Sequence, residues 1–376
     1  MRKIFNFLIL GISMSLAWSL RGQFGGLNGA MIPGALAAAV IVLLLHDEKW
    51  NFAAGRTILL GALGFSLGGT MRYGHLMEIV TSSQTLLPTG MDLLHIFGIG
   101  AIWGGLGTTF LGFGLCEKPL HKKDFLFFMV LAIFGFVPRV ILSMQTMSIY
   151  FYTAGLILLN AYNLMIKKSR VVFLFAMAGM WGFGLGFLFA VILLYLGSHG
   201  LLPGPYPWWT LADPITGFTG GCFLAAILGR LDYEDFASRW SFSPGLANPE
   251  RIFQRTGFLV FLFFIPGVNA LSAFEYWVRA QPFFSSQALF VIKMSSLVLF
   301  FLLAVRAFKI SGSPISSWAW ERILRSATLF FIWFLSAAAI ARQVSVGGWT
   351  SWVPAFTLFL MDAAILTVAL ALKVKL

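Results

Sequence analysis

Long apolar runs separated by short polar or glycine-rich breaks recur along the whole chain. Each run is continuous over about 16–22 residues, which predicts membrane-spanning α-helices rather than the short alternating strands of a membrane barrel. The runs predict spans at residues 4–20, 30–45, 57–71, 93–115, 125–143, 146–165, 171–197, 215–231, 257–278, 287–307, 323–341 and 352–373. Three of them, 30–45, 57–71 and 215–231, are short for a hydrocarbon core of about 30 Å. They are either half-helices, which would lower the count of about twelve spans to ten or eleven, or helices buried in protein.

The basic residues of the loops predict the orientation of these spans. With the N-terminus inside, alternate loops and the two chain ends hold twenty of the 26 Lys and Arg residues. The residues that remain for the spans and the opposite side are Arg21, Arg72, Arg139, Arg279, Lys293 and Arg342. Cytoplasmic loops of membrane proteins carry such an excess of positive charge, so both chain ends are expected inside the cell.

Composition agrees with a single transmembrane domain over residues 1–376. Of the 376 residues, 59% are hydrophobic and 11% are charged, and the mean hydropathy is +0.86. A soluble protein carries about 25% charged residues, so lipid must cover most of this surface. The net charge of +12 fits topology and contact with anionic lipid head groups, and no nucleic-acid partner is expected. We therefore predict an all-α, multi-pass bundle in the phospholipid bilayer of the inner (plasma) membrane, with the oligomeric state left open.

Two stretches of the chain resemble one another, at residues 60–115 and 178–231. Each holds a glycine-rich helix, a loop with Leu-Leu-Pro and a second glycine-rich helix. The second copy begins four spans after the first, so the two copies share one orientation and predict a parallel repeat of a helical hairpin. A weaker echo relates Ser15–Gln23 to Ser66–Gly74, with an arginine in each, and chance similarity explains this echo equally well.

Four spans of these hairpins each carry two glycines four residues apart. The pairs are Gly64 and Gly68, Gly100 and Gly104, Gly182 and Gly186, and Gly217 and Gly221. This GxxxG spacing places both glycines on one helix face and lets two backbones approach closely. The two hairpins are therefore expected to form the tightly packed centre, with the Phe-rich helices of residues 257–373 at the periphery.

Polar and charged residues gather where the spans meet the external side. Ionisable groups at membrane depth cost about 2.5–3.5 kcal/mol each, so they normally face a protein interior or a water-filled cavity. A ring of guanidinium groups suits a carboxylate, phosphate or sulfate, because arginine donates two parallel hydrogen bonds. The residues predicted to bind such an anion are Arg21, Gln23, Arg72, Tyr73, Arg139 and Arg342. The structural alternatives for each arginine are contact with lipid phosphates, capping of a helix end, or an ion pair with one of the acidic residues Glu78, Asp92, Asp213 and Glu275.

Two acid–histidine pairs and one intramembrane carboxylate complete the candidate chemistry. His75 with Glu78, and Asp92 with His95, lie three residues apart, a spacing that brings both side chains to one helix face. These four residues would supply acid–base catalysis if the protein is an enzyme, and interfacial histidines with ordinary hydrogen bonds are the simpler interpretation. Asp362 lies among apolar residues of the last span. It either couples transport to protons or hydrogen-bonds to a neighbouring helix.

These features favour one function and leave a second open. A parallel repeat, short glycine-interrupted helices and buried charges are usual in transporters, so we expect a transporter or lipid flippase for an anionic solute or lipid. The alternative is a membrane-embedded transferase that acts on a lipid-linked donor at the external leaflet, with the arginines holding a phosphate. A scaffold subunit is disfavoured by the number of charged groups at membrane depth. The sequence holds no P-loop, nucleophile elbow or dinucleotide fingerprint, and it predicts no cofactor and no metal.

Overall fold

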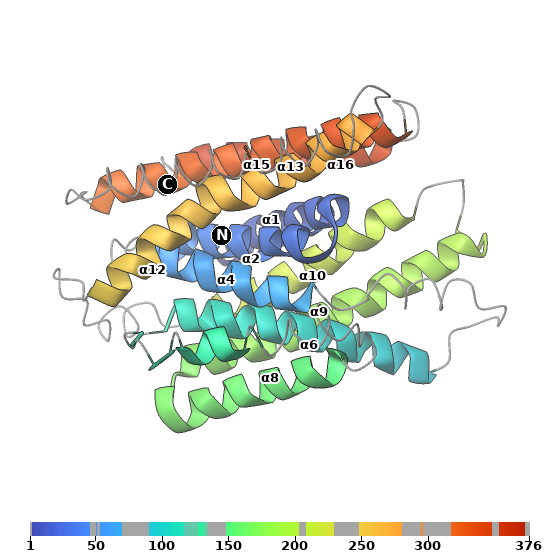
Figure 1. Cartoon of the computed structure of the whole chain (residues 1–376). Helices are drawn as coiled ribbons and strands as arrows, with labels where there is room; N and C mark the ends of the chain where they lie inside the picture. The colour runs from blue at the N-terminus through green and yellow to red at the C-terminus, as the bar shows by residue number, and fades with distance from the viewer. Residues whose placement is uncertain are drawn as a thin grey trace.

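The computed structural model describes most of the chain as a bundle of helices (Figure 1). The described residues are 2–45, 50, 53–69, 90–116, 118, 120, 121, 123, 124, 126–131, 133, 148–202, 208–228, 248–279, 295, 317–347 and 353–372. Every regular element within these residues is a helix, so the prediction of an all-α protein is confirmed. Most of the predicted spans 125–143 and 287–307 lies outside the described residues.

The described helices follow the remaining predicted spans. They are α1 (Arg2–Phe24), α2 (Gly26–Leu45), α4 (Ala54–Gly68), α6 (Gly90–Gly114), α8 (Ser148–Tyr162), α9 (Arg170–Ser198), α10 (Trp209–Leu228), α12 (Asn248–Leu259), α13 (Ile265–Arg279), α15 (Ser317–Gly347) and α16 (Val353–Leu372). A π-helical segment at Asn163–Lys167 extends α8, and another at Val260–Phe264 joins α12 to α13. Among the described residues, eight helices are long and apolar enough to cross a membrane, and α4 and Leu360–Ala371 of α16 are shorter apolar helices.

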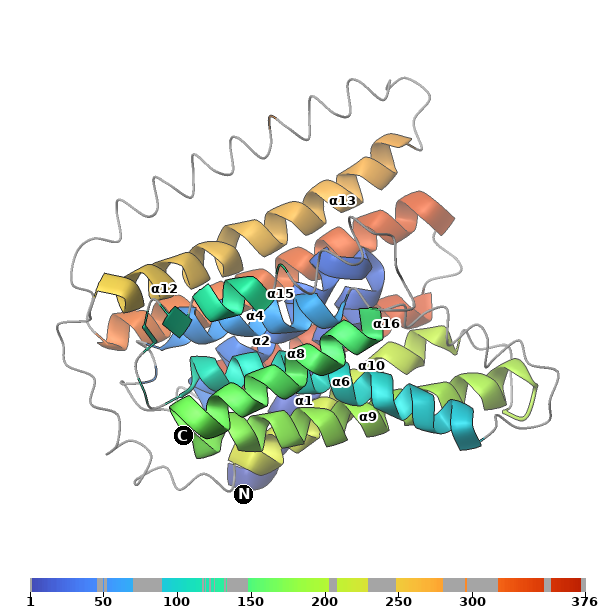
Figure 2. The same ribbon diagram turned by 60° about the horizontal axis from the view of Figure 1, so that its bottom comes forward.

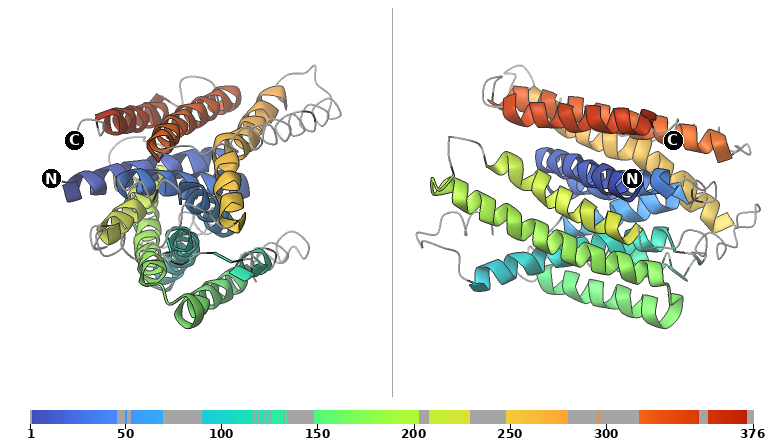
Figure 3. Two further views of the ribbon diagram at one scale, coloured as in Figure 1. Left: turned by 90° about the vertical axis from the view of Figure 1, so that its left-hand side faces the viewer. Right: turned by 180° about the vertical axis from the view of Figure 1, so that it is seen from behind.

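Six helices form a closed ring in which each packs along the next. The contacts run from α1 to α2, to α4, to α6, to α9, to α10 and from α10 back to α1. The interface between α6 and α9 is the most extensive, and α9 and α10 lie side by side in the view from behind (Figure 3). The ring is thus made of three hairpins, namely α1 with α2, α4 with α6 and α9 with α10. The packed centre includes α1 and α2 in addition to the two hairpins expected there.

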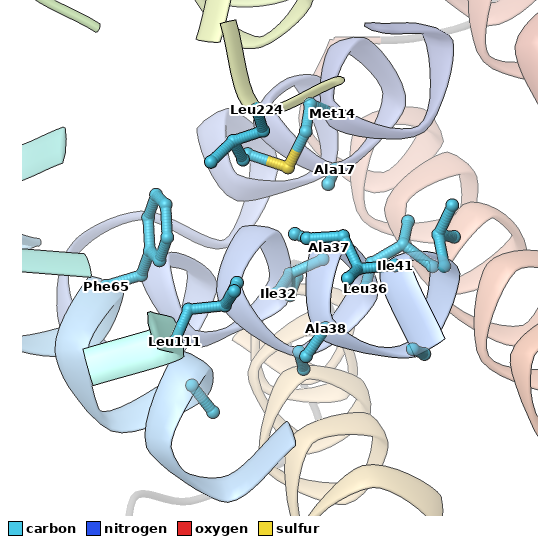
Figure 4. Packing of buried hydrophobic residues seen from close by; sticks show 14 of the residues in the cluster. Met14, Ala17, Ile32, Leu36, Ala37, Ala38, Ile41, Phe65, Leu111 and Leu224 are labelled. Carbon is cyan, nitrogen blue, oxygen red and sulfur yellow. The ribbon is translucent and has the colours of Figure 1, made fainter. Parts of the chain in front are cut away.

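Two of the short helices of the ring, α4 and α2, are covered by protein. At about 1.5 Å per residue, α4 is about 22 Å long, less than a hydrocarbon core of about 30 Å. All its residues except Leu59 and Leu63 are buried, and the apolar window of α2 is 94% buried. Figure 4 shows side chains of α2 among those of its neighbours: Ile32, Leu36, Ala37, Ala38 and Ile41 beside Met14, Ala17, Phe65, Leu111 and Leu224. Of the two explanations for short spans, burial in protein therefore holds for α2 and α4.

Each predicted glycine pair faces a single neighbouring helix. The pair of α4 contacts α6, the pair of α6 contacts α9, the pair of α9 contacts α10, and the pair of α10 contacts α1. A methyl group added at Gly104 would overlap the carbonyl oxygen of Gly179 and the Phe183 side chain. The two backbones thus approach to a distance that only glycine permits, which confirms the close packing expected at these pairs.

The other helices lie against the outside of the ring. α12 packs on α4, α13 packs on α15 and α2, and both α15 and α16 pack on α1. In Figure 1 α13, α15 and α16 form a layer along the top, and α8 lies at the bottom against α6. Figure 2 brings α8 forward and shows the same layers from below. The ring is therefore shielded on both of these sides by further helices.

A buried arginine, Arg56, lies at one end of the ring. Arg56, in the first turn of α4, is 2% exposed. Its Nε donates a hydrogen bond to the Gly114 carbonyl oxygen at 2.8 Å, and its Nη2 donates one to the Cys116 carbonyl oxygen at 3.1 Å. The last carbonyls of a helix lack partners within the helix and carry partial negative charge, so Arg56 stabilises the C-terminal end of α6. The candidate site lies towards the opposite end of α4.

Candidate functional site

Aromatic side chains fill the centre of the ring. Trp18 of α1, Phe65 of α4 and Phe183 of α9 contact one another, with ring centroids 5.0 to 6.2 Å apart. Trp103 of α6 lies 5.0 Å from Trp18, and Phe187 of α9 lies 5.6 Å from Trp103. All five side chains are fully buried. Tilted and edge-to-face contacts at these distances add to the stabilisation that burial gives.

Trp103 owes its position to two features of α4. A methyl group at Gly68 would overlap the Trp103 indole, so the glycine makes room for the ring. The indole N–H donates a hydrogen bond to the Phe65 carbonyl oxygen at 2.9 Å. The Trp103 ring is therefore fixed both in place and in orientation, and one of its faces is turned towards the end of α1.

Arg21, near the C-terminal end of α1, lies on this aromatic cluster. Its guanidinium carbon is 4.7 Å from the centroid of Trp103 and 5.7 Å from that of Trp18, within the range of a cation–π contact. Its Nη1 lies 3.6 Å from Oδ1 of Asp213 in the first turns of α10. The side chains of Arg21 and Asp213 are 12% and 23% exposed. The structure thus places Arg21 inside the helix ring and pairs it with one of the acidic partners considered from the sequence.

The local sequence makes room for the Asp213 carboxylate beside α1. A methyl group at Gly22 would overlap this carboxylate, so glycine leaves space for it in the observed position. Pro214 follows Asp213 in the second turn of α10, and its ring removes one hydrogen bond of the helix there. The Trp18 indole N–H lies towards the Asp213 carboxylate but outside hydrogen-bond geometry, and it has no other acceptor among the described residues.

Two further predicted ligands are partly buried. Gln23, two residues after Arg21, has a buried side-chain oxygen that accepts no hydrogen bond from the described residues. Arg342 lies on α15, outside the six-helix ring, with its Nε buried. Other predicted residues lie outside the described part of the chain, and they are Arg72, Tyr73, Arg139, His75 and Glu78. Of the predicted ligands, Arg21 is the one that the structure places on the aromatic cluster, and Gln23, Arg342, Arg72 and Arg139 stay predictions.

The candidate acid–base residues that are described do not lie in an enclosed site. Asp92 and His95 are both exposed on the first turns of α6. Asp362 of α16 is half-buried, and it accepts a hydrogen bond from Ser15 Oγ of α1 at 3.2 Å. Asp362 therefore contacts the same helix that carries Arg21, from outside the ring.

Two tryptophans of the site are absent from the sequence-based prediction. Trp18 precedes Arg21 by three residues, which places both side chains on one helix face. Trp103 lies between the paired glycines of α6, so its large ring stands out in a segment built for close packing. A search for aromatic residues one turn from each candidate arginine would have found Trp18. No sequence signal links Trp103 or Asp213 to α1.

Neither a metal centre nor a known family provides a further guide to this site. Within the described residues no three His, Cys, Asp or Glu side chains gather closely enough to hold a metal ion. No family model, curated protein or solved structure matches the chain. The functional argument therefore rests on the geometry of the site.

Proposed function

We propose that the chain is a multispanning membrane transporter or lipid flippase for an anionic solute or lipid, which binds at Arg21. The observation that carries this proposal is a guanidinium group that lies on two indole rings inside a closed ring of helices. An ionisable group at membrane depth is expensive and is retained mainly at substrate or ion pathways. A planar guanidinium suits a carboxylate or phosphate, because it donates two parallel hydrogen bonds.

The same proposal includes the finer features of the fold. We place about twelve spans in the inner (plasma) membrane with both chain ends inside, so that the Arg21 end of the ring faces outward. The hairpins of residues 60–115 and 178–231 are proposed to be a parallel repeat. Their support is a set of matching contacts, because Gly64 meets Gly107 and Phe110 just as Gly182 meets Gly220 and Phe223. Parallel repeats of this kind are common in transporters.

Flux measurements on the purified protein in liposomes test the function. The cargo panel contains labelled carboxylates, inorganic phosphate, sulfate and anionic phospholipids. We expect flux of at least one of them, and Arg21→Gln should reduce it roughly 10- to 100-fold because a charge-assisted hydrogen bond to the cargo is lost. Arg21→Lys should retain part of the flux, since the charge remains while the planar pair of donors is lost.

Arg325→Gln is the matched control for this experiment. Arg325 forms an ion pair with Glu321 within α15, with 2.6 Å between Nη2 and Oε1, and it lies outside the ring. Its loss removes the same charge and should leave flux unchanged. The proposed function is wrong if no cargo of the panel crosses the membrane, or if Arg21→Gln transports as well as the parent protein.

Asp362 is proposed to couple this transport to protons. Its hydrogen bond to Ser15 joins α16 to the helix that carries Arg21, so a change in its protonation would be felt by α1. We expect a proton gradient to drive accumulation of the cargo in the parent protein and not in Asp362→Asn. Exchange of labelled for unlabelled cargo without a gradient should persist in the variant. Loss of both activities would indicate a structural role and would contradict the coupling.

A further inference from the structure

The three hairpins of the ring make equivalent contacts at its centre. The first helices of the hairpins are α1, α4 and α9, and they contribute Trp18, Phe65 and Phe183, which meet pairwise. The residues that follow are similar in kind: Trp18-Ser19-Leu20, Phe65-Ser66-Leu67 and Phe183-Gly184-Leu185. One residue of each hairpin therefore lies on a common central axis. This pattern relates α1 and α2 to the two hairpins that resemble each other in sequence.

The seams between consecutive hairpins are equivalent as well. At each seam, the second helix of one hairpin contributes a glycine. This glycine packs on the backbone of the first helix of the neighbouring hairpin, at the residue four positions before the central aromatic residue of that helix. These pairs are Gly34 with Gly61, Gly104 with Gly179, and Gly217 with Met14. The three glycines also share a local sequence: Ile32-Pro33-Gly34, Ile102-Trp103-Gly104 and Ile215-Thr216-Gly217. The ring thus has the contacts expected of one hairpin unit present three times.

At one layer of the ring the three seams differ, because only one of them carries charged residues. One turn beyond each seam, the facing pairs are Ala30 with Gly69, Gly100 with Phe187, and Asp213 with Gly22. Arg21 corresponds in the same way to Gly68 and Gly186. The two seams that carry no charge at this layer also bring their helices into close contact, so the fold does not need an ion pair here. Arg21 and Asp213 are therefore additions to a ring that is otherwise built from glycine, alanine and aromatic residues.

We propose that Asp213 is a resident occupant of the anion site, and that a singly charged oxyanion from outside replaces it on Arg21. This inference rests on the proposed function and specifies its cargo as a carboxylate or a phosphodiester. The Nη1–Oδ1 distance of 3.6 Å exceeds the 2.7–2.9 Å typical of a charge-assisted hydrogen bond, so the resident contact is weak. Asp213 is also the more exposed partner, and its carboxylate can turn to water while the guanidinium stays on the two indoles.

The remaining groups of the site fit such an anion. The buried Trp18 N–H lies towards the carboxylate without forming a hydrogen bond to the described residues, so it can donate to a ligand oxygen. One guanidinium and one indole N–H compensate a single negative charge. A ligand with two charges would leave one of them without a partner in the interior, which is costly. The site therefore favours a monocarboxylate or a phosphodiester over sulfate or a dianionic phosphate.

Neutralising the resident carboxylate tests the exchange. Radiolabelled propionate binding is measured on protein in phosphatidylcholine nanodiscs. We expect Asp213→Asn, which keeps the shape of the side chain, to bind propionate about tenfold more tightly than the parent. The double variant Arg21→Gln/Asp213→Asn should lose this binding. Glu321→Gln is the matched control, because it removes a carboxylate from the Glu321–Arg325 ion pair and should bind as the parent does.

Chemical rescue gives a second measurement. Asp213→Ala restores the alanine that α2 has at the equivalent position, so the variant should fold. Acetate should raise its melting temperature by several degrees, and it should leave the parent and Arg21→Gln/Asp213→Ala unchanged. In the parent the Asp213 carboxylate already occupies the guanidinium, and the double variant has no guanidinium for the added carboxylate.

The outcomes distinguish failure of the exchange from failure of the proposed function. They also distinguish a free carboxylate from a lipid phosphodiester as the exchanging anion. Propionate binding that is equal in the parent and Asp213→Asn, or binding that survives Arg21→Gln, overturns the exchange and leaves transport elsewhere in the chain possible. If Asp213→Asn ignores propionate but retains phosphatidylglycerol about tenfold more strongly than the parent does, the exchanging anion is a lipid phosphodiester. If no variant binds either probe and no acetate rescue occurs, the anion site itself and the proposed function both fail.

Discussion

Gly179→Ala is expected to destabilise the ring strongly, because it separates α6 from α9 at their closest approach. The added methyl group would overlap the Thr108 hydroxyl and the Gly104 carbonyl oxygen. Thr108 Oγ1 already donates to the Gly104 carbonyl oxygen at 2.7 Å, so neither atom can move without breaking this hydrogen bond. Overpacking of a well-packed interior costs about 1–3 kcal/mol and sometimes more. A loss towards the upper end of this range is expected, since backbone rather than a flexible side chain blocks the methyl group.

Gly98→Ala on α6 is the matched control. A methyl group at Gly98 would meet nothing within 4 Å, so the substitution adds only helix propensity and should be neutral or slightly stabilising. Thermal unfolding is followed with a thiol-reactive fluorogenic dye, because both cysteines, Cys116 and Cys222, are buried in the folded protein. Equal melting temperatures for Gly179→Ala and the parent would mean that the α6–α9 interface is looser than described.

The spans and the close-packed helices were predictable because both leave a local signature in the sequence. A bilayer requires long apolar runs, and close approach of two backbones requires small residues at a spacing of four. Gly100 and Gly104 illustrate the second rule, since both face α9. The inclusion of α2 in the ring could not be predicted in this way. α2 meets the backbone of α4 through a single glycine, Gly34, which has alanines four residues away on either side, and alanine is common in every membrane helix.

The sequence echo and the helix contacts relate α1 to α4 in two different registers. The sequence echo pairs Ser15 with Ser66 and therefore Arg21 with Arg72, whereas the contacts pair Trp18 with Phe65. The two alignments differ by four residues, which is about one turn of helix and leaves the same face in contact. In a Gly-rich helix, residues four positions apart are often of the same type, so both alignments match similar residues. Only the contacts between helices distinguish the two alignments.

The candidate site was predictable only in part. The cost of burying charge identifies Arg21 from the sequence alone. Its contacts come from two other helices far away in the chain, with Trp103 on α6 and Asp213 on α10, and Gly22 leaves room for the Asp213 carboxylate. Trp103 escapes prediction because an aromatic residue in a membrane span is most often packing against its neighbours. Trp103 belongs to the site because the closed ring brings it next to α1, and no local sequence pattern indicates this contact.

Lys167→Met should be the most damaging charge removal in the described part of the chain. Lys167 Nζ lies 2.7 Å from Asp124 Oδ2, and the two side chains are 5% and 2% exposed. The Asp124 carboxylate also accepts hydrogen bonds from the His121 backbone N–H at 2.6 Å and from the Tyr162 hydroxyl. Removing one member of a buried ion pair leaves the other charge uncompensated and typically costs about 3–5 kcal/mol. A loss of this size is a large part of the ordinary free energy of unfolding, which is about 5–15 kcal/mol.

The neighbouring residue provides the control, because Lys168 carries the same charge and is exposed. Lys168→Met should change the melting temperature little, whereas Lys167→Met should lower it by many degrees. The double variant Lys167→Met/Asp124→Leu removes both buried charges, and it should recover a large part of the loss because no unpaired charge remains. A double-mutant cycle on these variants measures the coupling directly. If Lys167→Met and Lys168→Met melt at the same temperature, the pair is open to water and does not fix the end of α8.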